Sequence, residues 1–329
     1  MAANSKTQGI RATLMLVAAA IGWFWGGGFL SVAFDAGPQS LPGSADAAWA
    51  RFSPDGRLVV GGAGESASVW DVEKNSAGSA LPAAPPGDRI LSAAFSPDGT
   101  RLALGLSDGS AHVYLWKTRA LLKKFNTSGA FVREVAFTSG GRHLWTRSSG
   151  VEVWDLDSGK AIARPGAGLA IAASAAEDVV AVASGGEIQL YSGDGRERLA
   201  RISDFDGAPA ALAFSPDGLH LALALSEGEV RIWSAKGKFE RALTKPDATL
   251  ASLAWSSDSK YLAAGARDGR LLAWNAITGV FALEHQDEDV RPGGPAVLEF
   301  EPGTHRLLYS LVTKETSELR IAGLLGGAQ

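Results

Sequence analysis

The sequence predicts an all-β protein: a seven-bladed β-propeller of four-stranded blades, preceded by a single N-terminal transmembrane helix. Three observations lead to this prediction. An uncharged apolar run lies near the start, a motif returns about every forty residues after it, and turn signals divide each repeat into four short strands. The composition agrees with a folded chain, because 46% of the 329 residues are hydrophobic and only 20% are charged.

Residues 12–34 contain no charged side chain and read ATLMLVAAAIGWFWGGGFLSVAF. A helix rises about 1.5 Å per residue, so about 20 residues cross the apolar core of a bilayer. Only Lys6 and Arg11 are charged before Asp35, and both precede the run. The positive-inside rule therefore predicts a cytoplasmic N-terminus (1–11), a signal anchor in the lipid bilayer (12–34) and the rest on the outer side, periplasmic or equivalent.

A secretory signal peptide is the alternative interpretation of the same run. Ser31-Val32-Ala33 fits a small-x-small cleavage site, and cleavage there would release a secreted protein. The apolar region of a signal peptide is usually about 7–15 residues long, whereas this run is longer. It also contains Trp23 and Trp25, which suit a membrane interface, so the anchor is favoured.

Three small residues of the run, Ala18, Gly22 and Gly26, are spaced four apart. This spacing puts them on one helix face, where a second membrane helix can approach closely. They are therefore candidates for packing against a partner's membrane helix. The alternative is that they reflect the ordinary abundance of small residues in membrane segments.

The repeat is marked by the sequence Phe-Ser-Pro-Asp-Gly. Full copies occupy 52–56, 95–99 and 214–218, and degenerate copies begin at Phe137, Trp255 and Phe300. The weakest copy lies at 173–178, with Ala175 as its equivalent position. Successive copies are 43, 42, 37, 40, 41 and 45 residues apart. A period of this length indicates a repeat architecture.

Each repeat contains signals for four strands. Pro-Asp-Gly forms a tight turn after the first strand, because Pro fixes φ and Gly accepts a positive φ. Further turns are predicted at Asp108-Gly109 and at Ser158-Gly159. The third strand ends in an aromatic residue: Trp70, Tyr114, Trp154, Tyr191, Trp233 or Trp274. Four strands in about 40 residues make a propeller blade.

The pairs Trp70-Asp71 and Trp154-Asp155 at the end of the third strand, together with the Ser-Pro-Asp-Gly turns, make these units resemble WD repeats. The resemblance covers residues 47–325 and implies a propeller over 47–329. It also implies that an N-terminal segment completes the last blade, so residues 35–46 are a linker or a blade-closing strand, sought within 29–47. The Gly-His pair common in that family is missing from every unit, so its side-chain network is not expected here.

No motif predicts catalysis. The absence of Cys excludes a thiolate nucleophile and Cys-based metal sites, and neither HExxH nor GxxxxGK[ST] occurs. Residues 105–109 fit GxSxG, but they join two strands, whereas a nucleophile elbow joins a strand to a helix. His143, His220 and His305 recur at one outer position of their blades, so they do not converge on the channel. We expect no catalytic residue, no cofactor and no metal site, and the net charge of -4 argues against nucleic acid as a partner.

Acidic residues gather in two connections between blades. These loop-interface candidates are Asp204, Asp206, Asp287, Glu288 and Asp289. They form either an acidic rim for a basic partner or ordinary solvated loops. We expect a membrane-anchored protein–protein interaction module, an accessory or assembly subunit whose partners are integral membrane proteins. The alternatives are a propeller enzyme or small-ligand-binding protein that uses the central channel, and a cytosolic scaffold.

Overall fold

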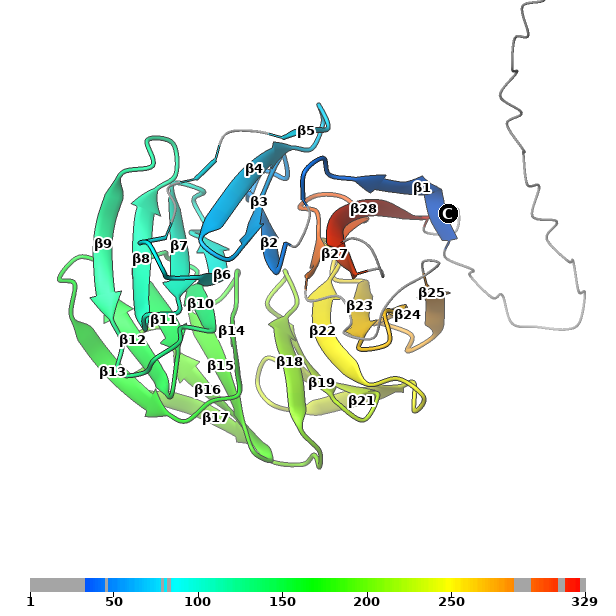
Figure 1. The fold of residues 1–329 in the computed structure, drawn as a ribbon. Coiled ribbons are helices and arrows are strands. Elements are labelled where there is room, and N and C mark those ends of the chain that lie inside the picture. The colour runs from blue at the N-terminus through cyan, green and yellow to red at the C-terminus, as the bar shows by residue number, and fades with distance from the viewer. Residues whose placement is uncertain are drawn as a thin grey trace, which may run out of the picture. The chain divides into compact units, whose positions relative to one another are not determined.

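The computed structural model describes residues 33–44, 47–77, 80–81, 84–286, 297–312 and 317–325. Within these ranges every regular element is a β-strand, and the strands form seven four-stranded antiparallel sheets (Figure 1). The first strands of neighbouring sheets contact one another around a central space. The predicted seven-bladed propeller is thereby confirmed.

The blades follow one another along the chain, and the strands of each blade run outward from the centre. Blade 1 contains β2 (Trp49–Phe52), β3 (Leu58–Ala63), β4 (Ser66–Asp71) and β5 (Ser76–Ala77). Blade 2 contains β6 (Ile90–Phe95), β7 (Arg101–Leu106), β8 (Ser110–Leu115) and β9 (Leu121–Asn126). Blade 3 contains β10 (Glu134–Phe137), β11 (His143–Arg147), β12 (Val151–Asp155) and β13 (Ala161–Gly166). Blade 4 contains β14 (Ala170–Ala173), β15 (Val179–Ser184), β16 (Glu187–Ser192) and β17 (Arg198–Ile202).

The last three blades complete the ring. Blade 5 contains β18 (Pro209–Phe214), β19 (His220–Leu225), β20 (Glu229–Ser234) and β21 (Phe239–Thr244). Blade 6 contains β22 (Leu250–Trp255), β23 (Tyr261–Ala266), β24 (Leu271–Asn275) and β25 (Phe281–His285). Blade 7 contains β26 (Leu298–Phe300), β27 (Arg306–Val312), β28 (Ser317–Leu325) and, as its outer strand, β1 (Ala33–Ser40).

The Ser-Pro-Asp-Gly turns owe their shape to a repeated hydrogen-bond pattern. In blade 2 the Ser96 hydroxyl donates to Asp98 at 2.5 Å, and the same carboxylate oxygen accepts the Thr100 amide at 3.0 Å. These bonds hold the pKa of Asp98 at about 2. In blade 4 the equivalent position is Ser174 and not Ala175, because it is the Ser174 amide that bonds across the turn, to the Val179 carbonyl at 2.9 Å.

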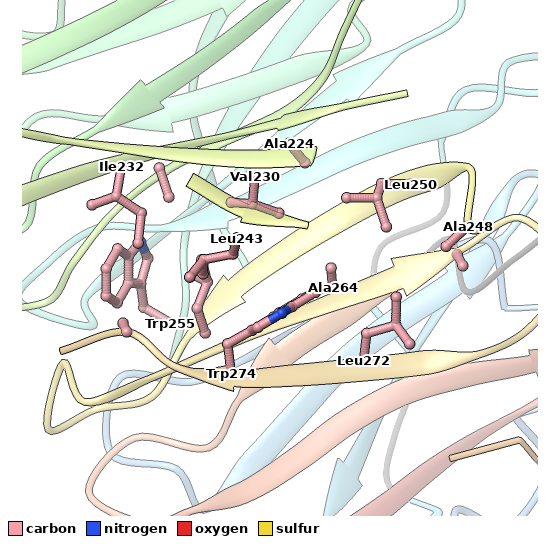
Figure 2. Close-up of a cluster of buried hydrophobic side chains, with 14 residues drawn as sticks. Ala224, Val230, Ile232, Leu243, Ala248, Leu250, Trp255, Ala264, Leu272 and Trp274 are labelled. Carbon is pink, nitrogen blue, oxygen red and sulfur yellow. The ribbon is translucent and has the colours of Figure 1, made fainter. Parts of the chain in front are cut away.

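The core lies between the blades rather than in one central cluster. Figure 2 shows one such cluster, where side chains of blades 5 and 6 interdigitate around Trp255 and Trp274. Trp274 and Trp233, both at the predicted third-strand position, are 1% and 0% exposed. Each square ångström of apolar surface buried contributes about 25 cal/mol, so these large side chains dominate blade-to-blade packing.

The ring is closed by the N-terminal strand. β1 pairs antiparallel with β28, the third strand of blade 7 (Figure 1). Just after β1, the Leu41 amide donates to the Leu319 carbonyl at 2.9 Å, and the Ser44 hydroxyl accepts the Leu319 amide at 2.8 Å. The Trp70 indole of blade 1 donates to the Pro42 carbonyl at 2.8 Å, so this segment joins the first blade to the last.

Most of the predicted membrane segment, with Ala18, Gly22 and Gly26, lies outside the described residues. Ala33 and Phe34, which the prediction assigned to the end of the helix, instead lie in β1, paired with residues 325 and 324. Their extended backbone is incompatible with a helix, so a membrane helix would end before Ala33. In the part of the chain that the structure describes, no helix is long and apolar enough to span a bilayer.

Deleting residues 1–48 should destabilise the propeller. The deletion removes β1, leaves the edge of β28 unpaired and uncovers Trp70, so we expect the free energy of unfolding to fall by more than about 3 kcal/mol. Urea denaturation followed by tryptophan fluorescence measures the change. Deletion of residues 1–32 is the control and should leave the midpoint unchanged. Equal midpoints for the two deletions would show that β1 does not hold the ring.

Candidate interaction surface

The propeller presents two faces of different construction. The turn face carries the turns that follow the first and third strands of each blade. There, the Trp116 amide donates to the Thr100 carbonyl at 2.8 Å, linking the two turns of blade 2. The connection face carries the turns after the second strands and the connections between blades. There, the Thr127 amide donates to the Gly109 carbonyl at 2.9 Å, which fixes the connection after β9.

Asp204 and Asp206, two of the predicted interface residues, lie in one connection but differ in role. The Asp204 carboxylate accepts a hydrogen bond from the Trp233 indole at 3.1 Å, and its backbone carbonyl accepts one from Arg231. Because Trp233 is fully buried, its indole N–H would have no hydrogen-bond acceptor without Asp204. Asp206 is exposed. The sequence could not separate these two residues, because the partner of Asp204 lies 29 positions further along the chain.

The second acidic connection contains Asp287, Glu288 and Asp289, which lie outside the described residues. Glu284, just before them, is bound by two cations: Arg270 at 2.8 Å and Lys245 at 3.0 Å. These hydrogen bonds, that of Arg270 first, lower the pKa of the Glu284 carboxyl.

Two further carboxylates complete this network on the connection face. The Arg270 guanidinium lies 2.8 Å from Asp247 and 2.7 Å from Asp268, and its hydrogen bond lowers the pKa of Asp247. Three carboxylates against two cations leave a formal charge of -1. Most of the negative charge of Glu284, Asp247 and Asp268 is therefore neutralised within the protein.

The central channel is a cavity of about 440 Å³ lined by the first strands of the blades. Small residues and aromatic rings line it. It also contains one pair of ionisable residues, Arg51 and Glu299, which the sequence analysis missed. The register of the repeat could have revealed both. They stand just before the aromatic residue of their strands, at a place where four other repeats have Ala94, Ala136, Ala213 and Ala254.

Glu299 bridges the first and last blades. Its carboxylate accepts the Phe52 amide at 2.9 Å. Burial raises the pKa of Glu299, while the charge of Arg51 and the Phe52 hydrogen bond act in the opposite direction. A carboxyl with a raised pKa in a cavity is a candidate functional group. Here its backbone hydrogen bond gives it a structural task at the seam of the ring.

A second polar group that the sequence analysis missed runs along β8. Three alternate residues of the strand, Ser110, His112 and Tyr114, form a hydrogen-bonded chain, with 3.1 Å from Ser110 to His112 and 3.2 Å from His112 to Tyr114. At its start, the Ser110 hydroxyl donates to Asp108, in the turn before β8, at 2.6 Å. Burial, then the nearby charge of Lys124, lowers the pKa of His112. Ser110 is 1% exposed and lies between the acid and the imidazole, an order that does not activate a nucleophile.

Each of the three histidines that follow the first turn of a blade lies near one carboxylate. His220 lies 2.7 Å from Glu240, and His305 lies 3.1 Å from Asp258. His143 lies 3.9 Å from Asp155. Among the residues that the structure describes, no group of three or more His, Asp or Glu side chains is arranged to hold a metal ion.

Comparison with known proteins agrees with this architecture. Residues 83–115 and 237–275 match the family described as WD domain, G-beta repeat. These two segments are similar to WD40 repeats. Both matches end at the third strand, at Tyr114-Leu115 and Trp274-Asn275, where the Trp-Asp pair of the repeat would stand. The repeat register inferred from the sequence is thereby confirmed in these two segments.

A solved propeller has the same fold. The crystal structure of the Cps50 (Swd1) β-propeller domain of Myceliophteria thermophila is similar with a TM-score of 0.73 and 13% sequence identity, over 86% of this chain and 98% of that one. No curated protein matches the sequence. WD40 repeats on a propeller support a protein–protein interaction scaffold.

Substitution of Asp204 should lower the stability of the protein, whereas substitution of Asp206 should not. Asp204→Ala leaves the buried Trp233 indole without its partner and should lower the free energy of unfolding by about 1 kcal/mol. Asp206→Ala, the matched control in the same connection, should change it by less than about 0.5 kcal/mol. Urea denaturation of both variants measures the difference, and equal effects would contradict the assignment.

The buried His112 should make stability depend on pH. Because its folded pKa lies below the usual 6.5, the unfolded chain binds the proton more readily, so stability is complete above pH 6.5 and falls as the pH drops below it. His112→Gln should flatten this slope between pH 7 and 5. Denaturation midpoints across that range test the prediction, and parallel slopes for the two proteins would refute it. Asp98, with its pKa of about 2, does not titrate in this window.

Proposed function

We propose that this protein is a membrane-anchored interaction module that serves as an accessory or assembly subunit of a membrane complex. The observation that carries the proposal is the place of β1. The outer strand of blade 7 begins at Ala33, at the end of the apolar run 12–34. An anchor in that run would hold the ring at the bilayer with almost no tether, because the chain passes from the run into the sheet without a linker.

The connection face is the surface we propose for the soluble part of a partner. It carries the exposed Asp206 and the Arg270 network with its charge of -1. It also carries Phe131 and Leu169, which are 48% and 55% exposed. Apolar side chains on a weakly acidic face suit a basic, partly apolar segment of another protein.

The partners we propose are integral membrane subunits. The helix face formed by Ala18, Gly22 and Gly26 would provide a second contact inside the bilayer. The charge distribution around the run favours a cytoplasmic N-terminus and a propeller on the outer side. Sequencing the N-terminus of the mature protein tests the anchor: an intact N-terminus is expected, and a mature chain beginning at Phe34 would show cleavage and secretion.

Purification from native membranes tests the interaction. The tagged chain, extracted in mild detergent, should bring an integral membrane protein with it, identified by mass spectrometry. Phe131→Ala combined with Asp206→Lys should reduce the recovered partner several-fold. Lys117→Gln on the turn face is the control and should leave recovery unchanged. A monomer that brings no protein with it would refute the subunit role.

A second candidate function is binding of a small ligand in the channel. The observation that favours it is the pair Arg51 and Glu299 in a cavity of about 440 Å³. Native mass spectrometry of the purified protein would reveal a retained ligand as added mass. That mass should disappear in Arg51→Ala if the channel is the site. An unliganded wild-type protein leaves the interaction module as the only candidate.

A further inference from the structure

Exposed apolar side chains are distributed unequally between the two faces. Of the eleven large apolar side chains that are exposed in the described residues, only Phe131 and Leu169 belong to the connection face. The other nine lie in the turns of the turn face or in the strand residues beside those turns: Leu115, Leu121, Leu122, Leu199, Leu219, Phe239, Ile277, Val280 and Phe281. They come from blades 2, 4, 5 and 6.

Blades 5 and 6 carry the densest part of this apolar rim. Leu219 and Ile277 are the most exposed, at 62% and 58%. Phe239 and Phe281 are held by edge-to-face contacts with the buried Trp233 and Trp274, at 6.2 and 5.6 Å between ring centroids. Both rings are therefore fixed in place with one side open to the surroundings.

Charged side chains lie among these apolar ones. Lys236 and Lys238 precede Phe239 in the chain and are exposed. In the described part of the chain, neither lysine has a carboxylate within 4 Å. The nearby acidic groups are engaged, since Glu240 pairs with His220 and Asp258 with both Lys260 and His305. Asp217 accepts the Ser215 hydroxyl in its own turn.

The chain also enters the propeller at the turn face. β28 follows the turn after the second strand of blade 7, so it starts at the connection face and ends at the turn face. β1 is antiparallel to β28, with Ala33 opposite Leu325 and Ser40 opposite Arg320. Ala33 therefore lies at the turn-face end of blade 7. In the sequence, residues 12–32 of the apolar run immediately precede Ala33.

We infer that the turn face rests on an anionic bilayer surface, with the apolar rim in the headgroup region and the connection face turned away toward the partner. This inference rests on the proposed anchor. A compact patch would suit a protein hot spot, whereas the rim spreads single apolar side chains around one edge of a disc. Fixed aromatic rings beside unpaired lysines are typical of interfacial membrane contacts. Lipid is therefore the occupant that fits both the rim and the point of entry.

Site-directed fluorescence tests the orientation, because the chain contains no Cys and single cysteines can be introduced cleanly. The full chain is reconstituted in vesicles of phosphatidylcholine and phosphatidylglycerol that carry a headgroup-linked nitroxide quencher. Labels on Leu219→Cys and Ile277→Cys should be quenched several-fold more strongly than labels on Glu227→Cys and Asp206→Cys. Glu227 belongs to the same blade as Leu219 but to the opposite face, so it is a matched control.

Charge removal tests the contribution of the lysines. Lys236→Gln combined with Lys238→Gln should lower the ratio of docked to undocked propeller about fivefold per lysine in vesicles containing phosphatidylglycerol. In pure phosphatidylcholine the same substitutions should have little effect. Arg89→Gln combined with Arg267→Gln removes the same charge from the connection face and should leave docking unchanged.

The outcomes separate this inference from the proposed function. Equal quenching on both faces, or stronger quenching on the connection face, would overturn the inference while the anchor stands. Turn-face labels that are already shielded in detergent without lipid would show a second copy or a protein partner on this face, which also overturns it. Release of the chain from the vesicles by alkaline carbonate would refute the anchor and the inference together. Failure to recover a partner would affect only the subunit role.

Discussion

The pairing of β1 with β28 is the constraint on which the rest of the propeller depends. Seven blades can pack around a channel only if the first and last are held together, and here two separate contacts do so. On the outside, β1 and residues 41–44 bind β28 and receive the Trp70 indole. On the inside, Glu299 accepts the Phe52 amide across the same seam. Because each core cluster lies between blades, opening this seam would loosen the packing of its neighbours in turn.

Closure also fixes the blade and the face at which β1 enters the ring. A ring is nearly symmetric about its axis, but the chain enters it at one blade and at one face. The two faces differ in chemistry, since one carries the apolar rim and the other the Arg270 network with Asp206. Under the proposed function, this polarity assigns one face to the membrane and the other to a partner.

The fold could be predicted from the sequence because local chemistry repeats. Ser-Pro-Asp-Gly specifies a turn through hydrogen bonds between residues at most five positions apart. A Trp or Tyr at the end of the third strand repeats with the same period, so the blade boundaries can be predicted from the sequence alone. Blade 4 shows the limit: without the motif, the turn position was placed one residue late, at Ala175 instead of Ser174. The surface was less predictable, because Asp204 and Glu299 take their roles from partners 29 and 247 positions away. A hydrogen bond between residues far apart in the sequence produces no motif that can be recognised around either residue.

The seam has a consequence for the order in which the protein matures. The Ser40 hydroxyl donates a hydrogen bond to Glu318, 278 positions later. During synthesis, β1 therefore cannot pair until β28 has been made. Until then blade 7 lacks its outer strand and the ring stays open, which slows folding and exposes an unpaired edge. Under the proposed topology, translocation of the chain across the membrane would have to be almost complete before the propeller could form. A chain truncated before β28 would therefore keep blade 7 incomplete and its β27 edge unpaired.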